Sequence, residues 1–182
     1  NIINHSMKVD LSTGACTLQP ELNVGLRRRP AYARLTDGRV VCAGGFTKGE
    51  REGDEDIALR TAEVLEFPTE LSPNGRWTLL PEMSVERANA AGCVLSDGRF
   101  AVFGGVDEFG GEGKASCEVL TLDGDIKRWD PLPPMPRARD DCYCVSVGGC
   151  VIVGGGKGIV AVDVYEEAVG RWRRLPGNFP PA

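Results

Sequence analysis

Cysteine is the most reactive residue type that this sequence holds in quantity, but its spacing does not predict a reactive site. Seven cysteines are present, and no two have the CxxC spacing of many metal and redox sites. Cys142 and Cys144 lie two residues apart, which on a strand places both side chains on one face. With His5 as the single histidine, they do not complete a four-ligand zinc set. We therefore expect the cysteines to be small apolar residues of strands, and reduced thiols favour a cytoplasmic or nuclear location.

Other motifs with chemical meaning are incomplete. Gly154–Gly158 is similar to a phosphate-binding loop, but no Ser or Thr follows Lys157 and no helix pattern follows the strand. The acidic run at 54–56 lacks the alternating ligands of an EF-hand loop. One histidine leaves general acid–base chemistry to carboxylates, and no pair of them stands out. We therefore predict no catalytic residue, no metal site and no cofactor, and we do not expect an enzyme.

Composition and charge exclude further classes. The 182 residues carry a net charge of −5 with a pI near 5.0, which disfavours nucleic-acid binding because phosphate neutralisation needs clustered Lys and Arg. The one basic run, Arg27 to Arg29, is interpreted as a solvated turn. No apolar stretch approaches the roughly 20 residues that span a bilayer. Neither nucleic acid nor a membrane is therefore an expected partner.

An internal repeat organises the chain. Three segments share an arginine, a short strand, a two-residue turn, a second strand and a diglycine; they are 29–45, 87–105 and 139–155. Their diglycines are Gly44-Gly45, Gly104-Gly105 and Gly154-Gly155. Their turns are Asp37-Gly38, Asp97-Gly98 and Gly148-Gly149. Such pairs between apolar runs favour type I′ turns, so each segment predicts an antiparallel hairpin.

Two further strands are expected after each hairpin. Third strands are predicted near 62–67, 117–122 and 159–165. Fourth strands are predicted to begin at Arg76-Trp77, Arg128-Trp129 and Arg171-Trp172. Runs such as Phe100–Phe103 are apolar throughout instead of alternating, which indicates strands buried on both faces.

This pattern resembles the kelch repeat, in which a diglycine ends the second strand and a tyrosine precedes a tryptophan by about seven residues. Tyr165 and Trp172 have that spacing, whereas Leu122 and Phe67 take the tyrosine position before the two earlier tryptophans. The resemblance covers nearly the whole chain. It implies an all-β fold, namely a partial kelch-type β-propeller of about 3.5 four-stranded antiparallel blades.

The blades divide the chain into four segments of one propeller domain. Residues 1–28 are expected to be the C-terminal half of a preceding blade, with strands at 7–11 and 15–18. Cys16 and Pro20 then take the places of the tryptophan and proline of a fourth strand. Three whole blades are predicted at 29–86, 87–138 and 139–182. The chain is therefore expected to be a fragment of a propeller.

Up-and-down topology gathers the long variable segments on one face of the propeller. These segments are 46–61, 81–87, 106–116 and 133–139. Candidate partner-binding residues on this face are Glu50, Arg51, Asp54, Glu55, Arg87, Asp107, Glu108, Phe109 and Arg139. The alternative for the loops is that they are merely solvated. For the two recurring arginines, Arg87 and Arg139, the alternative is an architectural role in which they bridge backbone carbonyls between blades.

The leading functional hypothesis is a protein–protein interaction module or scaffold that binds another protein or a peptide through these loops. The kelch resemblance implies this, since many kelch proteins are scaffolds or substrate receptors of ubiquitin ligases. A ligase role would need further domains outside this chain. The alternative is a propeller enzyme of oxidase, sugar isomerase or specifier type whose catalytic residues lie partly in missing blades. A third possibility is a purely architectural spacer.

Overall fold

A computed structural model describes residues 7–48, 56–66, 68 and 75–178. In this described part, strands and turns account for the regular structure, and no helix is long and apolar enough to cross a membrane. The architecture is all-β, as the sequence predicts.

Three four-stranded antiparallel sheets form the bulk of the molecule, and each runs from inner to outer strand in chain order. Blade 1 consists of β3 (Ala31–Arg34), β4 (Val40–Ala43), β7 (Ala62–Glu66) and β8 (Arg76–Leu80). Blade 2 consists of β9 (Ala91–Val94), β10 (Phe100–Phe103), β11 (Cys117–Asp123) and β12 (Ile126–Leu132). Blade 3 consists of β13 (Cys142–Val147), β14 (Cys150–Gly155), β15 (Ala161–Glu166) and β16 (Arg171–Asn178).

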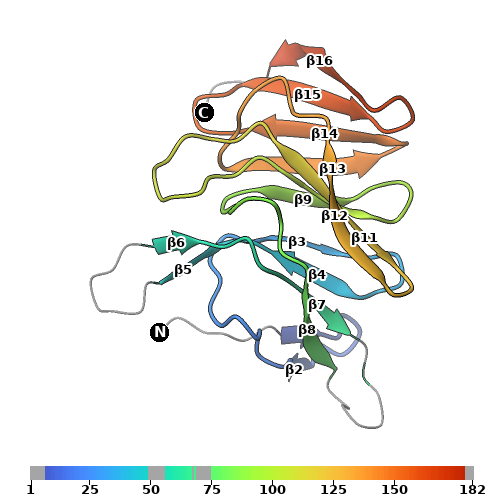
Figure 1. Ribbon diagram of the computed structural model, residues 1–182. Helices are drawn as coiled ribbons and strands as arrows, with labels where there is room; N and C mark the ends of the chain where they lie inside the picture. Colours follow the sequence, from blue (N-terminus) through green and yellow to red (C-terminus); the bar gives the residue numbers. More distant parts are fainter. Residues whose placement is uncertain (1–6, 49–55, 67, 69–74, 179–182) are drawn as a thin grey trace.

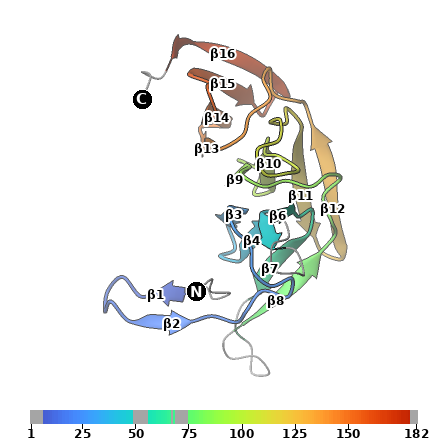
Figure 2. The same ribbon diagram turned by 90° about the vertical axis from the view of Figure 1, so that its left-hand side faces the viewer.

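The three blades stand one above another in Figure 1. Figure 2 shows them fanned along an arc, with β3, β9 and β13 on its inner side and β8, β12 and β16 on its outer side. The described sheets do not close into a ring. A two-stranded sheet, β1 (Met7–Val9) and β2 (Cys16–Leu18), lies beyond blade 1, where the sequence predicts two strands of a half blade.

The hydrophobic core lies between blades, because each sheet has two apolar faces. One cluster joins blades 1 and 2 through residues such as Val41, Val64, Phe100 and Leu120. A second cluster joins blades 2 and 3, and it includes the aromatic ring of Phe103. Strands that read as continuous apolar runs, such as β10, are buried along their whole length for this reason.

The recurring tryptophans connect each blade to the one before it. The indole N–H of Trp77 donates to the carbonyl of Pro20 at 3.1 Å. The N–H of Trp129 donates in the same way to Pro81, and that of Trp172 to Pro133, both at 2.8 Å. Pro20 therefore has the same role as Pro81 and Pro133, the prolines that follow β8 and β12. This supports the interpretation of β1 and β2 as the outer strands of a blade.

Two features differ from the predictions. The third diglycine is Gly155-Gly156 and not Gly154-Gly155: their φ values of 73° and 114° correspond to 65° and 93° at Gly44-Gly45, whereas Gly154 pairs with Tyr143 in the ladder. Three consecutive glycines conceal this phase in the sequence. A short hairpin, β5 (Phe46–Lys48) and β6 (Asp56–Ala58), also forms in a segment predicted to be a loop.

Candidate partner-binding face

A residue with positive φ lies one or two positions before each inner strand, on the face that carries the long loops, which we call the loop face. These residues are Arg29, Asn89 and Asp141, with φ of 53°, 56° and 58°. The backbone N–H of Asn89 donates to the carbonyl of Arg29, and that of Asp141 to the carbonyl of Asn89, both at 3.1 Å. A left-handed backbone is strained for these residue types, and here its recurrence links neighbouring blades close to the axis.

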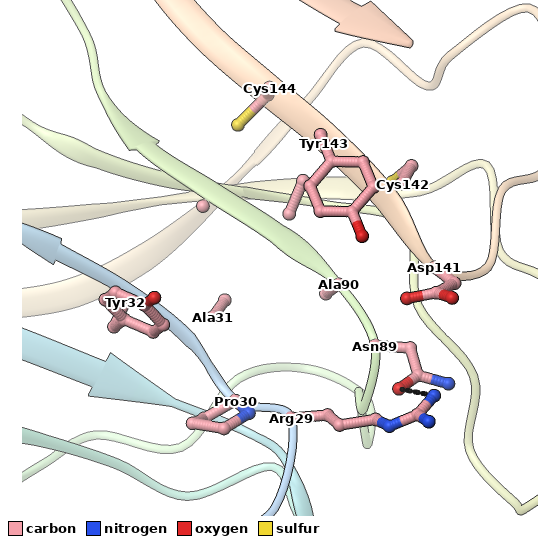
Figure 3. A pocket seen from close by; sticks show the side chains of 12 residues that line it. Arg29, Pro30, Ala31, Tyr32, Asn89, Ala90, Asp141, Cys142, Tyr143 and Cys144 are labelled. Atoms are coloured by element: carbon pink, nitrogen blue, oxygen red, sulfur yellow. Dashed lines mark hydrogen bonds between the residues drawn. The ribbon is translucent and has the colours of Figure 1, made fainter. Parts of the chain in front are cut away.

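A cavity of about 310 Å³ opens beside these three residues, between the inner strands. Figure 3 shows Tyr32 and Tyr143 on its walls and Asn89 accepting a hydrogen bond from Arg29. Cys144 also lines the cavity, on the wall formed by β13. The cavity is thus a mixed polar and aromatic hollow along the inner side of the blades.

Buried arginines hold the diglycine of each blade. Their guanidinium groups donate to the backbone carbonyls of the first glycine of the pair and of a residue just before, or at, the start of the third strand. The pairs are Arg27 with Gly44 and Thr61, Arg87 with Gly104 and Ser116, and Arg139 with Gly155 and Ala161. The recurring arginine of blade 1 is therefore Arg27 and not Arg29, which begins the segment that the sequence aligned.

Three of the arginine predictions are corrected by this arrangement. Arg27 is buried instead of lying in a solvated turn. Arg87 and Arg139, named as partner-binding candidates, are 1% and 0% exposed, so their side chains are not on the surface of the loop face. They have the architectural role that the sequence left open, except that each arginine bridges carbonyls within its own blade.

A buried carboxylate completes each arginine site, which we call a clamp, and sequence reasoning missed it. Arg27 pairs with Glu63, Arg87 with Glu118 and Arg139 with Asp163, at 2.8, 2.9 and 2.6 Å. A buried charge needs a partner because desolvation is costly. The available signal was an acid at the second or third position of each third strand, in Ala-Glu-Val, Cys-Glu-Val and Ala-Val-Asp-Val.

The clamp carboxylates also fix the links between blades. Glu63 accepts hydrogen bonds from the backbone N–H groups of Asn23 and Val24, and Glu118 accepts one from Ser84 at 2.8 Å. Burial alone would raise the pKa of Glu63, but its hydrogen bonds from Arg27, Asn23 and Val24 together lower it below the usual value. The segments that link one blade to the next, beside the loop face, are thus fixed by hydrogen bonds to buried carboxylates.

The first long loop is described only in part. Glu50, Arg51, Asp54 and Glu55 lie outside the described residues, so their candidacy stays a prediction. The described hairpin places Phe46 in a small buried cluster with Ala58, Ala88 and Val106. Arg28 and Asp56 form an ion pair beside it.

The second long loop presents an exposed aromatic ring. Phe109 is 72% exposed, and one side of its ring meets the buried ring of Phe46 edge-on, with ring centroids 6.0 Å apart. Asp107 is held by Lys114 at 2.6 Å, and this hydrogen bond lowers the pKa of its carboxyl. Glu108 forms an isolated β-bridge with Ile57 of the neighbouring loop. Asp107, Glu108 and Phe109 thus lie on the loop face, as the sequence predicts.

Backbone bridges join the loops of neighbouring blades into one surface. The bridged pairs are Arg28 with Phe46, Ile57 with Glu108, Ala88 with Val106 and Lys114 with Arg139. Three of these bridges join a long loop to a residue that lies three positions before an inner strand, namely Arg28, Ala88 or Arg139. The described parts of these loops are therefore ordered by main-chain contacts and cluster on one face.

Comparison with known proteins identifies the repeat. No protein-family model matches the chain. Kelch domain-containing protein 8B of Rattus norvegicus is 28% identical over 155 residues, which are 81% of this chain and 40% of that protein. Kelch-like protein 41b of Danio rerio is 31% identical over 124 residues, or 68% of this chain and 18% of that protein. The chain belongs to the kelch-repeat β-propeller family.

Two further comparisons agree with the kelch assignment. An F-box/kelch-repeat protein of Arabidopsis thaliana is 33% identical over 70 residues, which cover 35% of this chain and 18% of that protein. The solved structure of YjhT superimposes with a TM-score of 0.77 over 98% of this chain and 60% of that one, at 15% sequence identity, and shows the same fold. The kelch chain spans about 40% of the length of the protein 8B relatives.

Two cysteines of the kelch blades have raised pKa values because they are buried. All seven are free thiols, and Cys42 and Cys117 are buried in strands. Burial raises the pKa of Cys42 to about 11 and that of Cys117 to about 12, so both thiols stay protonated and are poor nucleophiles. Among the described residues, no group of three or more His, Cys, Asp or Glu side chains is placed to hold a metal ion.

Proposed function

We propose that this chain is a protein-binding module whose loop face binds a segment of another protein, without catalysis by the chain. The observation that carries the proposal is the joined pair of long loops, which displays Phe109 and Ile57 on an ordered scaffold. Exposed aromatic rings held in place by a rigid neighbour are typical anchors of protein interfaces. The kelch relatives are consistent with protein binding in general.

Site-specific photo-crosslinking tests the face. A benzophenone amino acid would replace Phe109 or Ile57 in the full-length protein, and control positions would be Ile126 and Val169. The controls are also exposed apolar residues, but they lie on the opposite face, Ile126 at the start of β12 and Val169 in the turn between β15 and β16. We expect discrete protein adducts from positions 57 and 109 and none from 126 and 169. Equal labelling from both faces, or adducts only from the controls, would reject the loop face as the binding site.

A part in substrate recognition by a ubiquitin ligase is a narrower form of this proposal. It is suggested by the name of the Arabidopsis relative, an F-box/kelch-repeat protein. Such a role requires domains other than these blades. Co-purification of the full-length protein with a cullin-containing complex, lost on removal of the additional domain but not on Phe109→Ala, is the expected result.

The absence of catalysis and the compartment are proposals of the same kind. Elemental analysis of the full-length protein tests the first, because a stoichiometric transition metal would favour the enzyme alternative. The free thiols of the blade interfaces support a reducing location, the cytosol or the nucleus. Imaging of the tagged full-length protein in its own cells tests the second, and a secreted or luminal signal would contradict it.

A further inference from the structure

The loop face carries two exposed apolar residues that come from different blades, Ile57 and Phe109, which we call the apolar pair. Ile57 lies on β6 of the blade 1 loop and is 55% exposed, while its neighbour Ala58 is buried. Phe109 lies in the blade 2 loop, and the β-bridge between Ile57 and Glu108 brings the two segments together. Both blades that bear the pair are complete four-stranded sheets, and they share a hydrophobic core. The pair therefore lies where two fully formed blades pack together.

The pair is held in position before any partner arrives. Phe46 is 2% exposed and packs edge-on against Phe109, and it is fixed in turn by pairing with Ala58 and by the bridge to Arg28. An anchor that is already ordered loses little conformational entropy on binding. This is the property that separates an anchor from a solvated side chain.

The charges around the pair are unequal. Asp107 is neutralised by Lys114, and Asp56 by Arg28. Glu108 and Glu112 are exposed, and within the described residues neither forms an ion pair. Within the part of the chain that the structure describes, these two carboxylates of the Phe109 loop therefore have no cation of their own, and positive charge on a partner would complement them.

We propose, building on the protein-binding function above, that the loop face recognises a basic segment with an apolar or aromatic side chain between lysines or arginines. The apolar side chain packs on the exposed side of the Phe109 ring, and Ile57 offers a second apolar contact on the neighbouring segment. The flanking cations lie against Glu108 and Glu112. An acidic segment is disfavoured here because it would place like charges together.

Matched peptides test this partner chemistry. Three fluorescein-labelled peptides of equal length are titrated with the chain: one with Phe flanked by Lys and Arg, one with Ala in place of Phe, and one with Glu and Asp in place of Lys and Arg. We expect the basic aromatic peptide to bind at least about tenfold more tightly than either of the others, in fluorescence anisotropy at low salt. Its affinity should fall as salt is raised.

Matched variants locate the site. Phe109→Ala should weaken binding of the basic aromatic peptide about tenfold, and Glu108→Lys with Glu112→Lys by at least as much. Asp123→Lys with Asp125→Lys makes the same change of charge at an exposed turn on the opposite face, and should change affinity less than about twofold. Thermal unfolding of each variant confirms that it is folded.

The outcomes separate the two levels of the proposal. Preference for the acidic peptide, with loss of binding in Phe109→Ala, would overturn the partner chemistry and keep the loop face. If the double variant at Asp123 and Asp125 weakened peptide binding as much as the double variant at Glu108 and Glu112, the attraction would be unspecific, towards any acidic surface. That result would overturn both the partner chemistry and the loop face as its site. No binding of the basic aromatic peptide up to millimolar concentration would overturn the partner chemistry, leaving the crosslinking result to decide on the face.

Discussion

Strands β9 and β13 have the same place in neighbouring blades, yet their side chains meet different surroundings. Ala91, which pairs with the residue before Gly104, is buried, and so are Cys93 and Leu95 further along the same face. The matching residues of β13 begin with Tyr143, which pairs with Gly154 just before the third diglycine. Tyr143, Val145 and Val147 are 75%, 55% and 57% exposed.

The contrast between the two strands indicates that packing between blades provides much of the stability of this chain. Apolar residues on the inner strands are buried by the neighbouring blade and not by their own sheet, because a single sheet cannot cover both of its faces. Blade 2 has a blade on either side in the structure, and its residues pack into both core clusters. The cost of a substitution should therefore depend on whether a blade stands beside the residue, more than on the residue type.

The largest expected effect is at the clamp of blade 2. Arg87→Ala leaves Glu118 buried, with the backbone N–H of Ser84 as its remaining hydrogen bond among those described, and removes the donor to two carbonyls. We expect a loss of about 4 kcal/mol in the free energy of unfolding, measured by urea titration. Arg139→Ala should cost less, because Arg137 lies 3.3 Å from Asp163 and supplies a second cation. Equal losses would show that Arg137 gives no such compensation.

The second effect separates backbone strain from crowding at two equivalent glycines. Gly104 and Gly155 have similar φ, 69° and 73°. A Cβ on Gly104 would lie 2.6 Å from the Arg139 carbonyl oxygen, whereas on Gly155 its nearest contact is 3.6 Å away, on the Tyr143 ring. Gly155→Ala should cost about 1 to 2 kcal/mol from positive φ alone, and Gly104→Ala about 3 kcal/mol or more.

Thermal denaturation of the two alanine variants beside the parent chain measures this pair. The comparison of blades 2 and 3 would break down if Gly155→Ala were as destabilising as Gly104→Ala. In that case strain, and not the neighbouring blade, would set the cost.

The third effect concerns the apolar faces themselves. Leu95→Ala removes a buried side chain from the joint between blades 2 and 3 and should cost about 2 to 3 kcal/mol. Val147→Ala removes an exposed side chain at the matching place in blade 3 and should change stability by less than about 0.5 kcal/mol. Urea titration measures both. A loss above 1 kcal/mol for Val147→Ala would mean that this face is covered in solution.

The sequence predicts the blades well because the signals for them are local. The turn at Asp97-Gly98 and the apolar run of β10 predict their hairpin without reference to any distant residue. The clamp escapes this reasoning, since a glutamate such as Glu118 inside an apolar strand has no visible partner until Arg87, 31 residues earlier, is folded against it. The clamp of blade 1 is also hidden in the sequence, because three consecutive arginines at 27–29 are possible partners and only the fold shows that Arg27 pairs with Glu63.

The residues of the candidate site also fall into those that the sequence predicts and those that it does not. Phe109 was expected on the loop face because loop topology follows from strand order, and the structure places it there. Its ordering by Phe46 depends on the β5–β6 hairpin, whose polar sequence resembles an ordinary loop. Arg87 and Arg139 were assigned to the same face from their position in the chain alone. Position along the chain predicts the end of the blade but not whether a side chain points inward.

The smallest expected effect is a change in pH dependence at the clamp of blade 1. Burial raises the pKa of Glu63, but hydrogen bonds from Arg27, Asn23 and Val24 outweigh it, so the pKa of the folded state lies below the ordinary 4.5. A lowered pKa means that the ionised carboxylate stabilises the fold above about pH 4.5, and that this contribution is lost as the pH falls through the lower, folded value. Glu63→Gln should therefore be less stable at pH 7, and its deficit relative to the parent chain should shrink below pH 4.5. Urea midpoints at pH 7, 5, 4 and 3 measure the deficit.

Glu66→Gln is the matched control: Arg76 and Thr78 lower the pKa of this more exposed carboxyl, and its smaller deficit should change less with pH because solvent weakens the pairing. A constant deficit for Glu63→Gln would show that the clamp acts through packing and hydrogen bonding alone, and the buried charge of blade 1 would then contribute nothing that depends on ionisation.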